Sequence, residues 1–191
     1  MATSRRDHLV DTALQLFYQD GFRATGIDKV LKESGVAKKT LYNHFASKDD
    51  LIVAALDKRD EDFMAKMRTT IARLAPRQGG DPRLSRVLAF FDGLDEWLNS
   101  DSFNGCTFIN ASAEYPQSDC PIHRACAAHK ERVLDTMESL LSDMPLGDAR
   151  QVAREVGLLA EGAIVNAHTA GDLGAARVAK AATRRLLASY L

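Results

Sequence analysis

The sequence is poor in the residues that support disulfide-bonded, sheet-rich or membrane-spanning proteins. Its three cysteines, Cys106, Cys120 and Cys126, are an odd number, so a disulfide framework is not expected. Five prolines, twelve glycines and little alternation of β-branched residues argue against an extensive sheet. No apolar run reaches the roughly eighteen residues of a membrane span, and none follows Met1 as in an export signal. We therefore expect free thiols, a cytoplasmic location and no membrane partner.

The net charge is also small, at −1, which excludes a uniformly basic nucleic-acid-binding protein. The charge is unevenly distributed along the chain, however. Residues 1–48 contain eight Lys or Arg and five Asp or Glu, a balance of +3, so the remaining residues carry −4. A positive N-terminal segment followed by a negative remainder would orient the protein on a polyanion.

Helical periodicity is abundant. Apolar residues recur at intervals of three and four along most of the chain, which predicts an all-α protein of about nine helices. Two short helices are expected on either side of Gly35, and the others over residues 4–19, 48–74, 83–98, 106–114, 122–141, 148–170 and 173–190, with a loop at 76–82. Thr25 with Asp28, and Ser47 with Asp50, have the spacing of capping boxes and predict two helix starts.

The segment from Thr25 to Leu51 combines two short helices and a tight turn at Gly35. Apolar residues at helical spacing predict the buried sides of both helices. The outward side of the second helix is polar, and its residues suit phosphates and base edges: Lys38, Lys39, Thr40, Tyr42, Asn43 and His44. No acidic residue occurs between Ala37 and Ser47, which is unusual for a helix that is merely solvated.

The pattern Gly35-Val36, Leu41-Tyr42-Asn43-His44-Phe45, Lys48 and Leu51 resembles the N-terminal domain of the TetR family of transcriptional repressors. The resemblance implies a helix-turn-helix DNA-binding domain over residues 1–51 and a helical effector-binding and dimerisation domain over 52–191. It also implies that Thr25 and Gly26 meet the DNA backbone, that the outward residues from Lys38 to His44 line the groove, and that Lys48 contacts phosphate.

Two contacts in this segment have alternatives. Lys39 could reach either a guanine or a phosphate, and His44 could orient Phe45 instead of contacting DNA. The segment departs from the family in one place, because Ala37-Lys38-Lys39 replaces a frequent Ser-Lys-Gly. This departure removes a helix-capping hydroxyl and adds a side chain close to the DNA.

The stretch from Gly105 to Glu114 resembles a Gly-Cys-x-x-x-Asn-x-x-x-Glu segment of some TetR-like ligand domains. Cys106, Asn110 and Glu114 are four residues apart and would share one helix face. In one interpretation the thiol fills space while Asn110 and Glu114 bond to backbone groups. In the other, Cys106 faces an effector cavity and reacts with an electrophile or oxidant, although no Lys or Arg lies near it in sequence.

Aromatic residues crowd the centre of the chain, and they would suit the wall of an apolar effector cavity. The candidate ligand-binding residues are Phe91, Trp97, Cys106, Phe108, Asn110, Glu114 and His123. His123, Cys126 and His129 recur every three residues, a spacing that turns the third about 120° around a helix from the first. No metal site and no other cofactor is therefore predicted.

The last two helices contain small and apolar residues that permit close helix packing. In TetR-like proteins this pair meets its symmetry mate, and the resemblance assigns a homodimer interface to Leu158, Leu159, Gly162, Val165, Asn166 and Leu187. An ordinary intrachain helical hairpin is equally compatible with these residues.

The sequence and its resemblance as a whole indicate a homodimeric, ligand-responsive repressor that binds a palindromic double-stranded DNA operator. A small-molecule effector would release it from the operator, and this effector would be an electrophile if Cys106 is the sensor. One alternative is a regulator that activates transcription. Another is a helical-bundle enzyme using Cys106, His123 and Glu114, but the sequence has no phosphate loop, His-Glu-x-x-His motif, nucleophile elbow or nucleotide fingerprint. We therefore expect a protein that is not an enzyme.

Overall fold

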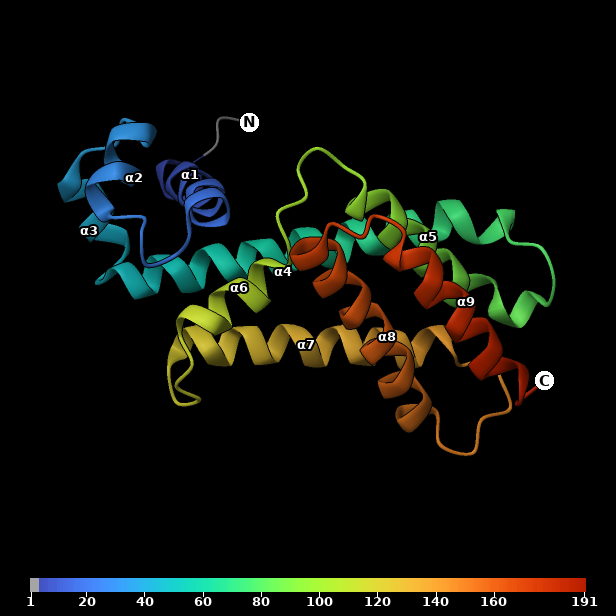
Figure 1. The fold of residues 1–191 in the computed structure, drawn as a ribbon. Helices are drawn as coiled ribbons and strands as arrows, with labels where there is room; N and C mark the ends of the chain where they lie inside the picture. The colour runs from blue at the N-terminus through green and yellow to red at the C-terminus, as the bar shows by residue number, and fades with distance from the viewer. Residues whose placement is uncertain (1–3) are drawn as a thin grey trace. The chain divides into compact units, whose positions relative to one another are not determined.

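The computed structural model describes residues 4–191, and within that range it contains helices and connections but no strand (Figure 1). The predicted all-α class is thereby confirmed. The helices are α1 (Arg5–Asp20), α2 (Ile27–Ser34), α3 (Lys38–His44), α4 (Lys48–Leu74), α5 (Ser85–Leu98), α6 (Thr107–Glu114), α7 (Pro121–Leu140), α8 (Ala149–Ala170) and α9 (Ala175–Ala188). Two short 3₁₀ helices, η1 (Ala75–Arg77) and η2 (Pro82–Leu84), overlap the two ends of the loop predicted at 76–82.

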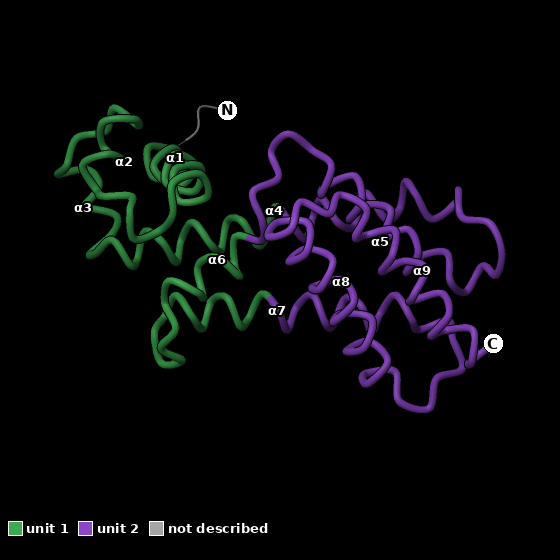
Figure 2. Tube along the Cα trace, viewed as in Figure 1, with its two compact units in different colours: residues 1–62, 107–129 green, residues 63–106, 130–191 purple. Residues whose placement is uncertain are grey.

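The chain forms two compact units, and each of them is built from two separate segments of the sequence (Figure 2). Among the described residues, the first unit contains 4–62 and 107–129, and the second contains 63–106 and 130–191. Helices α4 and α7 therefore each contribute residues to both units. The division after residue 51 stays a prediction about domains, but the first compact unit extends beyond that point and includes α6.

In the first unit, α1 is defined at both ends by the residues around it. Ser4 begins the helix, because its Oγ accepts a hydrogen bond of 3.1 Å from the backbone N–H of Asp7. Gly21 ends it with a φ of 91°, and its N–H donates to the carbonyl of Phe17 at 3.1 Å. The buried side of α1 packs on α2 and α3 and consists of Leu9, Val10, Ala13 and Phe17.

One predicted capping box is present and the other is not. Ser47 and Asp50 exchange two hydrogen bonds of 3.1 Å at the start of α4, as predicted. Thr25, by contrast, does not cap α2. Its side chain is fully buried, and its hydroxyl donates 2.8 Å to the carbonyl of Gly21 and 3.3 Å to that of Leu16. The residue that caps α2 is Gly26, which has no side chain to supply a bond.

In the second unit, α9 packs against both α5 and α8. Lys180 of α9 reaches Asp92 of α5 at 2.5 Å, and Gln78 bonds to the other oxygen of the same carboxylate at 2.6 Å. Helices α4 and α5 approach closely where Gly93 faces Thr70, because a Cβ at Gly93 would lie 2.7 Å from the Thr70 Cγ2. No helix within residues 4–191 combines the length and apolar character that a bilayer crossing requires.

Candidate nucleic-acid interface

The turn between α2 and α3 depends on a glycine. Gly35 has a φ of 66° and a ψ of 12°, a left-handed conformation that other residues rarely adopt, and its N–H donates to the carbonyl of Leu31 at 3.0 Å. Two residues later Ala37 begins α3 without a capping side chain, as the replacement of the family's frequent serine predicted. The result is a helix, a tight turn and a second short helix, which is the arrangement of a helix-turn-helix.

Helix α3 has one buried side and one exposed side. Leu41 is completely buried, and Phe45, directly after the helix, is buried too. Tyr42, with 47% of its surface exposed, is among the few large apolar side chains left open to solvent. The predicted groove-facing residues lie together on this helix, with Lys38, Lys39, Tyr42, Asn43 and His44 exposed and Thr40 half-buried. The surface they form is cationic and contains hydroxyl, amide and imidazole groups.

Contacts from α1 hold the helix-turn-helix formed by α2 and α3 in place. His8 bonds through Nε2 to the carbonyl of Ser34, at the end of α2, with a separation of 3.0 Å. The guanidinium of Arg6 lies 5.4 Å from the ring centre of Phe45, a cation–π arrangement just after α3. The Lys38 Nζ is 4.0 Å from the Asp28 Oδ1, and both side chains are well exposed, so this ion pair holds Lys38 only weakly.

The other predicted DNA-contacting residues occupy different environments. Thr25 is buried with its hydroxyl bonded inside the protein, so its side chain is not available to a phosphate in this structure. Gly26 is exposed, and a Cβ there would meet nothing within 4 Å. Lys48 is half-buried and donates from Nζ to the carbonyl of Arg23 at 3.2 Å, and burial lowers the pKa of its ammonium group. Its predicted phosphate contact would require this bond to open.

Glu114 makes a contact that the sequence did not suggest. Its two carboxylate oxygens accept hydrogen bonds from the backbone N–H groups of Phe22 and Arg23, at 2.8 and 2.6 Å. No local pattern in the sequence indicates these bonds, because the bonded residues are more than ninety positions apart. Bonding to backbone groups was one of the two interpretations of Glu114, and the sequence did not indicate which groups.

Cys106 has a cation beside it that no local sequence pattern revealed. The Lys130 Nζ lies 3.7 Å from the Cys106 Sγ and also pairs with both carboxylate oxygens of Glu161, at 2.7 and 2.8 Å. Cys106 is buried and not in a disulfide. Next to it, Gly105 has a φ of 78°, and a Cβ there would lie 2.5 Å from the His168 Nδ1. These groups all belong to the second unit.

The predicted aromatic residues are divided between the two units. In the second unit Trp97 makes edge contacts with Phe63 and Phe103, with ring centres 6.3 and 5.2 Å apart, while Phe91 is completely buried. That unit also has an open groove of about 540 Å³ that contains none of the predicted ligand-binding residues. Its lining is Arg68, Ile71, Ala72, Ala75, Arg86, Asp135, Thr136, Ser139 and Leu140.

In the first unit Phe108 stacks on His129, with ring centres 3.6 Å apart and planes 8° apart. His129 bonds through Nδ1 to the Asp60 Oδ1 at 2.6 Å, and His123 bonds through Nδ1 to the carbonyl of Tyr115 at 2.9 Å. Asn110 is half-buried on α6. Across residues 4–191, no three His, Cys, Asp or Glu side chains lie close enough together to hold a metal ion.

The residues predicted for the dimer interface differ in exposure. On α8, Leu158 is 72% exposed and Val165 is 42% exposed, while Asn166 is exposed and Leu159 and Gly162 are half-buried. Leu187 of α9 is completely buried within its own protomer, so its side chain belongs to the core of the second unit. Val178 on α9 is 66% exposed and was not predicted.

Comparisons with known proteins agree with this geometry. The family model described as bacterial regulatory proteins, tetR family, matches residues 9–55. The chain is 30% identical over 157 residues to the transcriptional activator FasR of Mycolicibacterium smegmatis, which covers 82% of this chain and 68% of FasR. It is 31% identical over 110 residues to the transcriptional repressor NemR of Escherichia coli, covering 57% of this chain and 53% of NemR. A TetR-family regulator from Streptomyces coelicolor superposes with a TM-score of 0.84 at 32% identity, covering 98% of this chain and 90% of that one.

Proposed function

We propose that this chain, which belongs to the TetR family of transcriptional regulators, binds a twofold-symmetric DNA operator as a homodimer through α3 of each protomer. The observation that carries the proposal is α3 itself. Its apolar residue Leu41 is buried, while two lysines, a tyrosine, an asparagine and a histidine are exposed together with no acidic residue among them. This composition suits phosphate oxygens and the edges of bases in a major groove.

The dimer sets the spacing of the two recognition helices. Successive major grooves on one face of a duplex are one helical turn apart, about 34–36 Å, so two α3 helices must be presented at that distance or a multiple of it. A small-molecule effector that binds better to a dimer with a different spacing shifts the population away from the DNA-binding form. Operator affinity then falls by at most the ratio of the effector's affinities for the two forms.

The DNA-binding mode is tested by the variants Lys38→Ala and Tyr42→Ala. We expect Lys38→Ala to weaken binding to all duplexes and to reduce the slope of log affinity against log salt by about one, because one phosphate contact is lost. Tyr42→Ala should lower affinity for the operator with little change in salt dependence. The matched control is Lys66→Ala, which removes the same charge from an exposed position in the second unit. Unchanged affinity in both α3 variants, with an intact dimer, would overturn the proposal.

The dimer is proposed to form through the exposed apolar side of α8 and α9. Leu158, Gly162 and Val165 are spaced by four and three residues and lie along one side of α8. Glycine within a helix costs about 1 kcal/mol relative to alanine. A Cβ at Gly157 or Gly162 would nevertheless meet nothing within 4 Å in the protomer. The space left by these glycines suits the close approach of a second helix.

This interface is tested by Leu158→Glu, with Glu155→Gln as a charge-changing control one turn away on the same helix. Sedimentation should show a monomer for Leu158→Glu and a dimer for the control, because the new carboxylate would be desolvated at the interface. Operator affinity should fall with dimerisation. A Leu158→Glu protein that remains a dimer at micromolar concentration would place the interface elsewhere.

An electrophilic effector is favoured by the position of Lys130 beside Cys106. The Lys130 Nζ donates a hydrogen bond of 3.7 Å to the sulfur, so a donor is directed at the atom that would react. The thiolate sulfur would add to the β carbon of an α,β-unsaturated carbonyl compound, and the proton from the thiol would end on the α carbon, so no further reactant is needed. The new substituent would then disturb the Lys130 pairing with Glu161.

The test uses N-ethylmaleimide on a protein in which Cys120 and Cys126 are replaced by serine. We expect one adduct on Cys106, slower addition in Lys130→Met, and release of operator DNA after addition. If DNA stays bound after complete labelling, the effector is not sensed through this thiol. The groove lined by Arg68 and Leu140 has a volume within the range of small-molecule sites and is then the next candidate.

We propose that the protein represses transcription, as the relative named as the repressor NemR does. Activation is the alternative, because the relative FasR is named as an activator. Operator binding implies a cytoplasmic location, where the DNA lies. The enzyme alternative is not favoured. Glu114 and His123 both bond to backbone groups, and the cation next to Cys106 is a lysine, so these three residues do not form a nucleophile with its base.

A further inference from the structure

We infer that Glu114, at the end of α6, is a positioning residue for DNA binding, because its carboxylate holds the connection between α1 and α2 on which the helix-turn-helix is built. This inference goes beyond the proposed DNA-contacting residues and rests on the DNA-binding function. It also assigns Glu114 a role different from the effector contact that the sequence predicted.

The carboxylate of Glu114 acts as a receptor for two consecutive backbone amides. Oε1 accepts from the N–H of Phe22 at 2.8 Å, and Oε2 accepts from the N–H of Arg23 at 2.6 Å. Hydrogen bonds to a charged acceptor are shorter and stronger than those between neutral groups. Both oxygens therefore fix the path of the chain directly after the end of α1.

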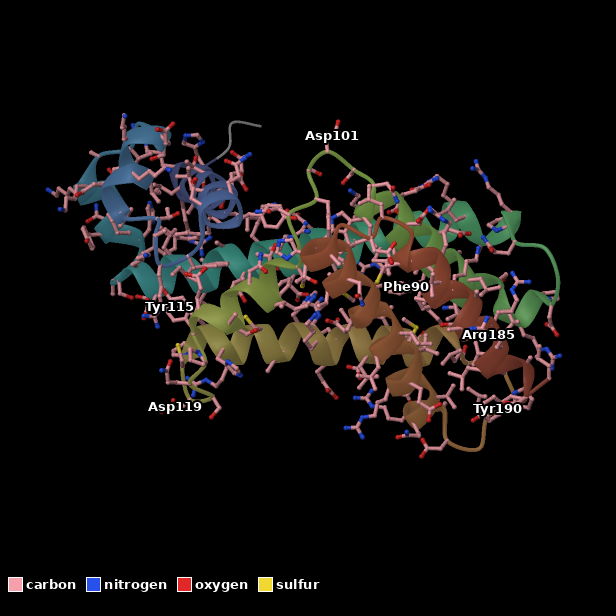
Figure 3. All side chains as sticks on the ribbon, in the orientation of Figure 1. Phe90, Asp101, Tyr115, Asp119, Arg185 and Tyr190 are labelled. Carbon is pink, nitrogen blue, oxygen red and sulfur yellow. The ribbon has the colours of Figure 1, made fainter. Side chains whose placement is uncertain are left out.

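The contact is reciprocal. The Arg23 Nε donates to the backbone carbonyl of Glu114 at 2.8 Å, and the Arg23 guanidinium lies 4.9 Å from the ring centre of Tyr115. That carbonyl is at the end of α6, where it has no partner within the helix. Tyr115 lies at the start of the connection from α6 to α7 (Figure 3). Arg23 thus caps α6 while Glu114 holds the segment that contains Arg23.

The location of Glu114 has no local explanation. The C-terminal end of a helix carries a partial negative charge, so a carboxylate there is unfavourable for the helix itself. Its two acceptor bonds are made to residues more than ninety positions earlier in the chain. The glycine before these amides is also closely packed, because a Cβ at Gly21 would lie 3.3 Å from the Glu114 Oε1. The carboxylate of Glu114 therefore stabilises the contact between α6 and the segment after α1, and not α6 itself.

The segment held by Glu114 determines where α2 begins. Phe22 is buried and stacks on Phe17 of α1, with ring centres 5.3 Å apart, and Thr25 bonds back to the carbonyl of Gly21. Lys48, at the start of α4, holds the carbonyl of Arg23. Helix α2 then begins at Ile27 and is followed by the turn and α3. Loss of the carboxylate would free two amides in the segment that orients both helices.

The test compares Glu114→Gln and Glu114→Ala with Asp119→Asn. Asp119 lies at the tip of the connection between α6 and α7 (Figure 3), and its side chain has no bonding partner within residues 4–191. Removing a negative charge by itself tends to strengthen DNA binding, because the backbone of DNA is anionic. The electrostatic effect and the positioning effect therefore have opposite signs, and Asp119→Asn measures the first alone.

Affinity is measured on a duplex selected in vitro with the wild-type dimer. We expect roughly tenfold weaker binding for Glu114→Gln, which keeps one acceptor oxygen, and a larger loss for Glu114→Ala, which keeps none. Asp119→Asn should bind as tightly as the wild type or slightly more tightly. The amide protons of Phe22 and Arg23 should exchange faster with solvent in both Glu114 variants, while the amides within α5 should not change.

The outcomes separate this inference from the proposed function. If Lys38→Ala weakens binding and Glu114→Gln does not, Glu114 has no positioning role although the DNA-binding mode stands. If Lys38→Ala, Tyr42→Ala and Glu114→Gln all leave affinity unchanged, the DNA-binding mode itself is wrong. If Glu114→Ala fails to fold, Glu114→Gln alone decides, because tighter or unchanged binding with unchanged amide exchange at Phe22 and Arg23 overturns the inference.

Discussion

Replacing Thr183 with valine should stabilise the protein. Thr183 lies on α9, its side chain is completely buried, and its Oγ1 has no hydrogen-bond partner within the part of the chain that the structure describes. A buried hydroxyl without a partner costs about 1–3 kcal/mol. Valine has nearly the same shape and replaces the hydroxyl with a methyl group, so the surrounding side chains of the second unit need not move.

The magnitude follows from that penalty. We expect the free energy of unfolding to rise by about 1 kcal/mol, the low end of the range for a buried unsatisfied group. For a chain of this length 1 kcal/mol corresponds to a rise of about 2–4 °C in Tm. Thermal and urea unfolding are followed by circular dichroism at one fixed protein concentration, since the stability of a dimer depends on concentration.

Thr136→Val is the matched control. Its hydroxyl donates to the carbonyl of Arg132 at 2.9 Å, so the same substitution removes a formed hydrogen bond and should not stabilise. If Thr183→Val instead lowers the free energy of unfolding by about 1 kcal/mol or more, the hydroxyl has a partner such as a buried water, and the reasoning is refuted.

Two further substitutions test close packing and burial of charge. Gly93→Ala should destabilise by about 1–3 kcal/mol through the contact with Thr70, with partial recovery in the Thr70→Ser double variant. If Gly93→Ala and the wild type have equal free energies of unfolding, the close contact between residue 93 and Thr70 is contradicted. Burial, followed by the charges of Asp60 and Glu61, raises the pKa of Asp57 above 3.8, so folding disfavours its charged form at neutral pH. Asp57→Asn should therefore stabilise at pH 7, and the gain should fade below about pH 4; a gain that persists at pH 3 would have another cause.

Local patterns predicted the helices well because each depends on residues close in sequence. The predicted helix over residues 48–74 matches α4, and its capping box at Ser47 and Asp50 is formed. The same reasoning was wrong at Thr25, although the spacing to Asp28 is identical. There the hydroxyl bonds to carbonyls at the end of α1, which is a contact between elements and outside the reach of a capping rule.

The candidate sites show the same division. The exposed residues of α3 could be named in advance, since a seven-residue helix with one buried side leaves the others outside. The cation next to Cys106 could not, because Lys130 is twenty-four positions away and reaches the sulfur only through the packing of the second unit. The family resemblance assigned Leu187 to the dimer interface, but its side chain is buried within the protomer, where α9 contacts both α5 and α8.

The sequence by itself determined the all-α class, the two short helices around Gly35 and the cationic, acid-free face from Lys38 to His44. These follow from periodicity, backbone freedom and side-chain chemistry over a few residues. Only the tertiary structure decided that the carboxylate of Glu114 holds the amides of Phe22 and Arg23, and that Lys130 approaches Cys106. Such bonds join residues far apart in the chain, and their partners are selected by how the helices pack, which no local pattern specifies.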